Sequence, residues 1–148
     1  MLASLDPFFD GGGTQAQTGL GFQPDITWIK CRSGAESHVI GNSVRGGNKY
    51  VYTNANTLEG SLTTYLKSFD TDGFTVGSGG FVGSNNATYV GWNWKCGTTS
   101  GVSGGSITPL GYSFNATSKV SVVAYTGNGT LLNSSILDNL SFKYNKNT

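Results

Sequence analysis

The chain has little of several residues on which common protein classes depend. Its 148 residues include one His, two Cys and three Pro, and only 11% of residues are charged. The single His38 and two cysteines outside any CxxC motif are too few for a His/Cys metal site. A formal net charge of +1 provides no basic surface that would collect phosphates. We therefore expect no bound metal and no nucleic-acid partner.

Long apolar runs are missing as well. No stretch reaches the ~20 apolar residues that a membrane helix needs. The first residues, MLASLDPFFDGGG, lack the basic start and sustained apolar run of a secretory signal. We expect no membrane partner.

The motifs of nucleotide-binding proteins and hydrolases are also absent. The chain contains no GxxxxGK[ST] and no strand–GxGxxG–helix unit. Its one GxSxG string, GVSGG at 101–105, falls in a Gly/Ser/Thr stretch and does not form the strand-to-helix elbow of a hydrolase. A polysaccharide hydrolase would need paired carboxylates about 5–10 Å apart, and the eight Asp and Glu residues fall mostly in turn sequences. Asp70 and Asp72 lie in DTDG at 70–73, which resembles the opening of a calcium loop, but the overlapping TDGF at 71–74 predicts a hairpin turn in preference to a cation site. We expect no enzyme and no cofactor.

Glycine, with 23 residues, and many Ser, Thr and Asn residues are typical of short strands joined by turns. Runs with a period of two predict the strands. In residues 88–96 the alternation places Val90, Trp92, Trp94 and Cys96 on one face, which we expect to be the core face. The expected strands lie within residues 25–31, 48–54, 73–77, 88–96 and 119–125.

Residues 56–69 permit two structures. Leu58, Leu62 and Leu66, with Tyr65 and Phe69, have helical spacing, whereas a glycine and two consecutive threonines disfavour a helix. The segment is either a short helix or a strand.

The stretch GTTSGVSGGS divides the chain. We expect a β-sandwich domain at 1–97, a Gly/Ser/Thr linker at 98–106 and a β tail at 107–148. Cys31 and Cys96 can pair only if the fold brings their Cα atoms within roughly 7 Å. Two free thiols are the simpler interpretation.

Four ordered blocks together resemble a known family. They are LGFQPDITWIKCR, SHVIGNSVRGGNKYVYTN, SFDTDGFTVGS and YVGWNWKCG. Their order is similar to that of a repeat domain of unassigned function in bacteriophage structural, tail-fibre-like proteins, mainly from marine phages. In such repeats a phrase like YTGNGT begins a domain. By this resemblance FFDGGGT at 8–14 is a domain start, and VVAYTGNGT at 122–130 begins a truncated second repeat. Asn42 stands where the family usually has an acidic residue and Cys96 where it has a small one. The family offers no established catalytic residue to carry over.

The fold that we expect is all-β: an antiparallel two-sheet sandwich, jelly-roll-like, with a short C-terminal β tail that could add a strand to a neighbouring subunit. The resemblance implies a virion protein of a tail fibre, tail tip, capsid-surface fibre or capsid decoration, acting by assembly and surface display. Its partners would be copies of itself, in a homo-oligomer such as a trimer, and other virion proteins.

The alternative function is a carbohydrate-binding module that attaches to host surface glycans. Possible glycan or partner contacts are Trp28, Tyr50, Tyr52 and Arg45. For Arg45, which glycines follow in SVRGGNK, a structural role in tying the loop is the favoured interpretation.

Overall fold

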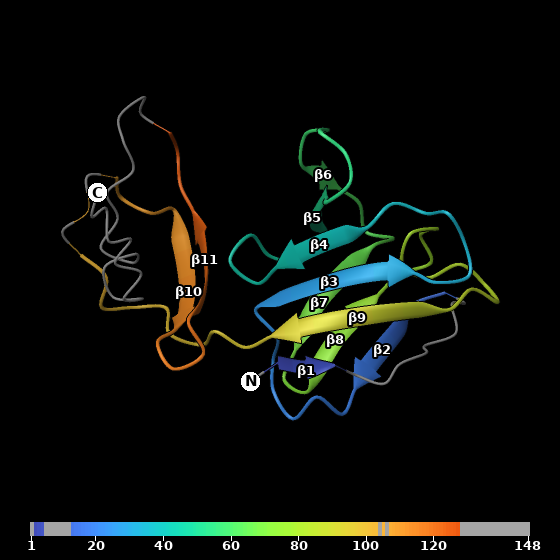
Figure 1. The fold of residues 1–148 in the computed structure, drawn as a ribbon, viewed down its shortest axis with the longest axis horizontal. Helices are drawn as coiled ribbons and strands as arrows, with labels where there is room; N and C mark the ends of the chain where they lie inside the picture. Colours follow the sequence, from blue (N-terminus) through green and yellow to red (C-terminus); the bar gives the residue numbers. More distant parts are fainter. Residues whose placement is uncertain (1, 5–12, 104, 106, 128–148) are drawn as a thin grey trace, which may run out of the picture.

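The structure is a computed structural model that describes residues 2–4, 13–103, 105 and 107–127. These residues form eleven strands and no helix, and every paired strand is antiparallel. The expectation of an all-β fold is confirmed. The strands make two sheets that lie face to face and a separate hairpin (Figure 1).

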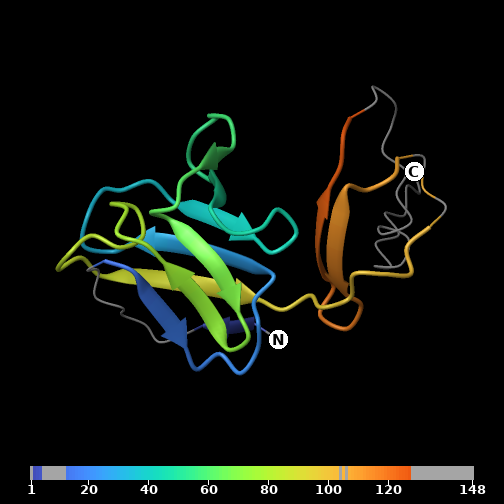
Figure 2. The ribbon, with the colours of Figure 1, turned by 180° about the vertical axis from the view of Figure 1, so that it is seen from behind.

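The larger layer is a six-stranded sheet in the order β1-β9-β3-β4-β5-β6. The smaller layer is a three-stranded sheet in the order β2-β8-β7, which covers one face of the larger sheet (Figures 1 and 2). This arrangement is the antiparallel two-sheet sandwich. The strands of the larger sheet are β1 Leu2–Ser4, β3 Ile26–Cys31, β4 Val39–Asn42, β5 Lys49–Tyr52, β6 Gly60–Ser61 and β9 Tyr89–Trp94; those of the smaller sheet are β2 Gln15–Thr18, β7 Leu66–Asp70 and β8 Gly73–Val76.

The core lies between these two sheets. Leu66 and Phe74 from the smaller sheet are each 1% exposed and press against the larger one. Glycines on the larger sheet make room for them, since a Cβ on Gly41 would lie 2.6 Å from Leu66 Cδ2 and one on Gly91 would lie 3.4 Å from Phe74 Cζ. The inner face of the larger sheet is therefore built from small and medium residues where the opposing side chains are large.

The face assignment predicted for residues 88–96 is wrong for Val90 and the two tryptophans. Along β9, Tyr89, Gly91 and Asn93 are buried, whereas Val90, Trp92 and Trp94 are half-buried on the opposite face. The alternation itself is correct. An indole ring on the inner face, where Gly91 lies, would collide with Phe74 of the opposing sheet. Cys96 is buried as expected, two residues beyond the end of β9.

The helical alternative for residues 56–69 is also wrong. Gly60 begins β6 and Leu66 begins β7. A Cβ on Gly60 would lie 2.3 Å from Tyr50 Cζ, so the glycine permits close packing on that ring. Leu58 is 92% exposed while Leu66 is 1% exposed, which shows that the leucines share no buried stripe.

The expected C-terminal β tail is a hairpin of β10 Gly111–Asn115 and β11 Val120–Ala124. It forms its own two-stranded sheet beside the sandwich (Figure 1). Thr98 bridges to Phe114, and Gly97 N donates to Ser113 Oγ at 2.9 Å, so the hairpin is tied to the segment that leaves the sandwich. Most of 8–14 and the end of 122–130, the two phrases assigned to repeat starts, lie outside the described residues.

Candidate interaction surfaces

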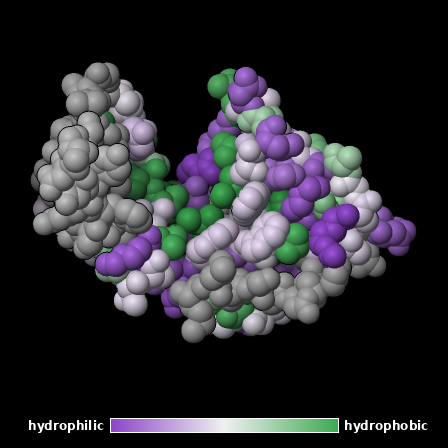
Figure 3. Space-filling view, viewed as in Figure 1, coloured by the Kyte–Doolittle hydropathy of each residue, from purple (hydrophilic) through white to green (hydrophobic). Residues whose placement is uncertain are grey.

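The outer face of the six-stranded sheet carries a band of apolar and aromatic side chains, which we call the outer aromatic face. Strand pairing sets its members side by side: Trp28 lies opposite both Trp92 and Ile40. Figure 3 shows pale and hydrophobic surface over β3, β4 and β9, and no described element covers these strands on this side (Figure 1). All members are half-buried; they are Ile26, Trp28, Ile40, Val51, Val90, Trp92 and Trp94.

Trp28 lies at the centre of this face, packed between two other rings. Its ring centroid is 5.1 Å from that of Trp92, with the planes tilted by 41°, and 6.3 Å from that of His38. Trp28 Nε1 is buried, with no hydrogen-bond partner among the described residues. The indoles therefore brace each other at an angle and do not form one flat platform.

Tyr50 and Tyr52 lie on the opposite, inner face of the same sheet. Their ring centroids are 5.3 Å apart, and Tyr65 is 4.5 Å from Tyr50. Tyr50 is only 7% exposed, and burial raises the pKa of all three phenols. The structure thus separates Tyr50 and Tyr52 from Trp28 and packs them with Tyr65 on the core side of the sheet.

Arg45 belongs to the loop between β4 and β5. Its guanidinium pairs with Glu59, and its backbone N–H donates to Asn42 Oδ1 at 3.0 Å. Glu59 adjoins Leu58, which is 92% exposed in a loop that projects from the sandwich beside β6 (Figure 1). The Arg45–Glu59 ion pair therefore connects the β4–β5 loop to the loop that precedes β6.

Asp25, which was not among the sequence candidates, joins three parts of the sandwich. It is 6% exposed. Its Oδ1 accepts from Ser43 Oγ at 2.6 Å, and its Oδ2 accepts from Cys96 N at 2.8 Å. One carboxylate thereby connects the start of β3, the end of β4 and the segment after β9.

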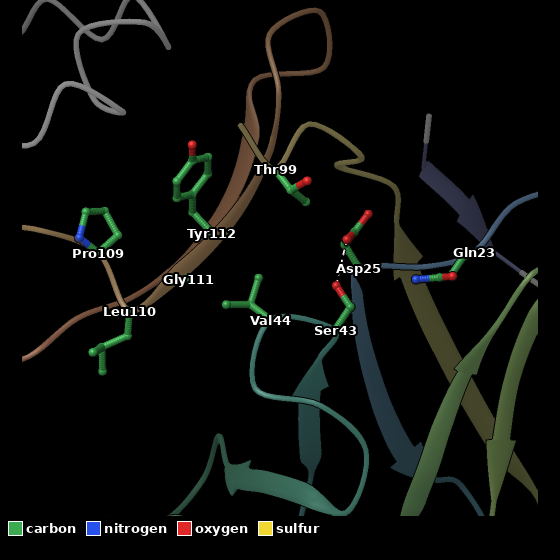
Figure 4. A pocket seen from close by; sticks show the side chains of 9 residues that line it. All are labelled: Gln23, Asp25, Ser43, Val44, Thr99, Pro109, Leu110, Gly111 and Tyr112. Carbon is green, nitrogen blue, oxygen red and sulfur yellow. Dashed lines mark hydrogen bonds between the residues drawn. The ribbon is translucent and has the colours of Figure 1, made fainter. Parts of the chain in front are cut away.

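Asp25 and Ser43 also line a pocket between the sandwich and the hairpin. Figure 4 shows the Asp25–Ser43 pair on one wall and Leu110 and Tyr112 on the other. The pocket holds about 510 Å³, and Leu110 is 76% exposed. Both carboxylate oxygens of Asp25 already have donors within the chain. The lining residues are Gln23, Asp25, Ser43, Val44, Thr99, Pro109, Leu110, Gly111 and Tyr112.

The turn at Asp70–Gly73 is a structural connection. Asp72 accepts hydrogen bonds from Gly19 N at 3.0 Å and Gly21 N at 2.5 Å, and Asp70 accepts one from Thr75 Oγ1 at 2.7 Å. The two bonds to Asp72 tie the β7–β8 turn to the chain that follows β2, and the bond to Asp70 closes the β7–β8 hairpin itself. The described part of the chain contains no group of three or more His, Cys, Asp or Glu residues that could hold a metal ion.

Cys31 and Cys96 are free and buried, as the simpler interpretation predicted. Burial, together with the nearby Asp25 carboxylate, raises the pKa of Cys96 to about 12. The unfolded thiol ionises near pH 9, so the unfolded state loses a proton that the folded state keeps. Stability that is present below pH 9 is then lost as the pH rises toward 12.

We expect the free energy of unfolding to fall by about 1 kcal/mol between about pH 9 and about pH 10 through Cys96 alone. Chemical denaturation at the two pH values, with and without Cys96→Ala, measures this contribution. Cys96→Ala should show the shallower decline. Identical slopes in the two proteins would contradict the burial of an un-ionised thiol.

The sandwich with its attached hairpin defines a small all-β module with one aromatic sheet face left open by the described elements. The sequence matches a family described as a domain of unknown function (DUF7483) over residues 7–142. The chain belongs to this family, and the match spans the linker, the hairpin and every strand of the sandwich except β1. Neither a curated protein nor a solved structure gives a significant match. In the described residues no helix has the length and apolar character needed to cross a membrane.

Proposed function

We propose that the chain is a bacteriophage virion structural protein, part of a tail fibre, a tail tip or a fibre or decoration on the capsid surface. It acts by assembly and surface display and not by catalysis. The ordered blocks that resemble phage structural repeats support this proposal. They supply β3, β4, β5, β8, β9 and most of β7, which are six of the nine strands in the two sheets of the sandwich.

The outer aromatic face is the observation that carries the assembly role. Large aromatic side chains gathered on an uncovered sheet face are typical of surfaces that a partner covers. The only charged side chains that point to this face from β3 and β5 are Lys30 and Lys49, at its margins. Lys30 Nζ is held by the carbonyls of Cys31, Gly34 and Glu36. The centre of the face is therefore apolar, and other virion proteins or copies of this chain are the proposed partners.

Immunogold labelling of intact particles tests the proposal directly. An antibody raised against the purified chain is expected to label particles from the source that encodes it. Gold on the tail or its fibres would assign a tail-fibre or tail-tip position, and gold over the shell would assign a capsid-surface position. Particles that carry the protein nowhere would overturn the virion proposal.

A host-glycan-binding module is the second candidate function, and one observation favours it. Trp28 and Trp92 are half-exposed aromatic residues on an open face, and such rings can stack on sugars. Their 41° tilt prevents both rings from lying flat on one saccharide chain, so the assembly role remains preferred.

We expect a glycan array to give no signal with the native chain. If a signal appears, Trp92→Ala should abolish it, whereas Tyr50→Phe should leave it unchanged because Tyr50 is buried. That pattern would replace assembly by glycan attachment as the function of this face. A signal that survives Trp92→Ala would exclude the outer aromatic face as the glycan site.

A further inference from the structure

The β10–β11 hairpin has one free edge. On the β10 side, Thr98 and Phe114 exchange backbone hydrogen bonds of 3.0 and 2.9 Å. On the β11 side, no strand among the described residues pairs with the hairpin. The edge of β11 is therefore open to a further strand from outside this part of the chain.

The backbone groups at the free edge follow from strand alternation. Phe114 directs its N–H and C=O groups to Thr98, away from β11. In an antiparallel pair successive residues point their backbone groups to alternate sides, so Ser113 bonds to Val122, its register partner. The residues on either side of Val122, which are Ser121 and Val123, then direct their N–H and C=O groups outward.

The sequence of β11, VSVVA, does nothing to block pairing. It contains no proline and no charged residue, the two features that commonly protect sheet edges. All five residues are only half-buried, and an isolated two-stranded sheet is marginally stable in water. A further strand would provide hydrogen-bond partners for the exposed N–H and C=O groups of β11 and would enlarge the hairpin into a stable sheet.

We propose that two copies of the chain pair antiparallel along β11, with a two-fold axis at Val122. In this register Ser121 exchanges both backbone hydrogen bonds with the partner's Val123, and Val123 does the same with the partner's Ser121. The result is one four-stranded sheet, β10-β11-β11-β10. The inference deepens the assembly role proposed above, on which it rests, by naming the strand through which copies meet.

The charges and rings at the ends of β11 favour this antiparallel register. It places Lys119 of one copy beside Tyr125 of the other, and Tyr125 is 48% exposed. An ammonium group beside an exposed aromatic ring is a favourable contact. A parallel in-register pair would instead set the two Lys119 ammonium groups side by side, where they repel.

Single cysteines on β11 test the register. Val122→Cys places two thiols on the axis, in a pair without backbone hydrogen bonds and with Cα atoms about 4.5 Å apart, which a disulfide can span. Mild oxidation should convert most of this variant to a covalent dimer. Ala124→Cys is the matched control on the same strand face; it should remain uncrosslinked alone and should crosslink when mixed with Val120→Cys. The native Cys31 and Cys96 are buried and should not interfere.

Sedimentation of the full chain provides the second measurement. The native protein should sediment as a dimer or a larger assembly. Ser121→Pro, which removes an outward N–H, should shift it toward monomer, whereas Ser121→Ala should not. A native monomer at the highest soluble concentration, or equal crosslinking at 122 and 124, would overturn the β11 pairing. Gold-labelled particles without β11 crosslinking would reject this inference alone; crosslinking without labelled particles would reject the virion location alone.

Discussion

Replacing Asn93 with aspartate is expected to lower the free energy of unfolding by about 4 kcal/mol at about pH 7. Asn93 is 0% exposed. Its Oδ1 accepts from Thr27 Oγ1 at 2.9 Å, and its Nδ2 donates to Gly91 O at 3.3 Å. A carboxylate there keeps the first bond but sets a second oxygen against the Gly91 carbonyl. Burial raises the pKa of such a carboxyl, and a rise of about three units corresponds to about 4 kcal/mol.

The pH dependence gives the sign of this effect. In the Asn93→Asp variant the folded pKa of the introduced carboxyl lies above its unfolded value of about 3.9. The variant and the native protein should therefore differ least below about pH 4, and the deficit should grow as the pH rises from there to the folded pKa and level off above it. Urea denaturation of both proteins from about pH 4 to about pH 7 measures this divergence.

A charge at a neighbouring outward position provides the control. Val90 lies in the same strand but on the outer aromatic face, half-buried. Val90→Glu should cost only about 1 kcal/mol because its carboxylate reaches water. Equal losses for Val90→Glu and Asn93→Asp, or the reverse order, would mean that β9 presents its other face to the core.

The β9 strand shows which parts of the fold the sequence predicts. The period of two in TYVGWNWKC is a local property, and it correctly predicts a strand with two different faces. Which face turns inward depends on the opposing sheet, where Leu66 and Phe74 need Gly41 and Gly91 opposite them. No local pattern contains that information, so hydrophobicity alone assigned the indoles to the core.

Long-range pairing also explains why the candidate contact residues Trp28 and Tyr50 lie on different faces of the molecule. Trp28 and Tyr50 both lie in the larger sheet, yet register places them on opposite faces. Pairing between β4 and β5 decides this, and a single sequence does not fix it. The sequence did contain one signal for the outer aromatic face. Trp92 and Trp94 alternate with a glycine and an asparagine, and the tryptophans face outward if those smaller residues face the core.

Asp25 shows a different limit. Its side-chain partners, Ser43 and Cys96, stand 18 and 71 residues farther along the chain. A single aspartate before a strand is a common feature, and nothing in its neighbours marks it as buried. Only the assembled sandwich brings its two donors to one carboxylate, so a long-range polar anchor of this kind is found from the structure and not from the sequence.

Asp25→Ala is expected to lower the free energy of unfolding by about 3 kcal/mol. The substitution removes two charge-assisted hydrogen bonds and leaves the Ser43 hydroxyl and the Cys96 N–H without their acceptor. Ser43→Ala removes one of these bonds together with its donor and should cost only about 1 kcal/mol. The double variant should lose less free energy of unfolding than the sum of the two single-variant losses, because it has no Ser43 hydroxyl left without an acceptor. Denaturant unfolding of the four proteins measures this cycle.

Asp25→Ala should also loosen the connection to the hairpin. The carboxylate holds the Cys96 N–H, and the next residue, Gly97, donates to Ser113 Oγ in β10. Amide hydrogen exchange at Gly97 should therefore be faster in Asp25→Ala under conditions where the sandwich remains folded, while Ser43→Ala should leave it nearly unchanged because Cys96 keeps its acceptor. Unaltered exchange at Gly97 in Asp25→Ala would mean that the hairpin is held to the sandwich independently of this carboxylate, through Thr98 and the contact of Gly111 with Val44.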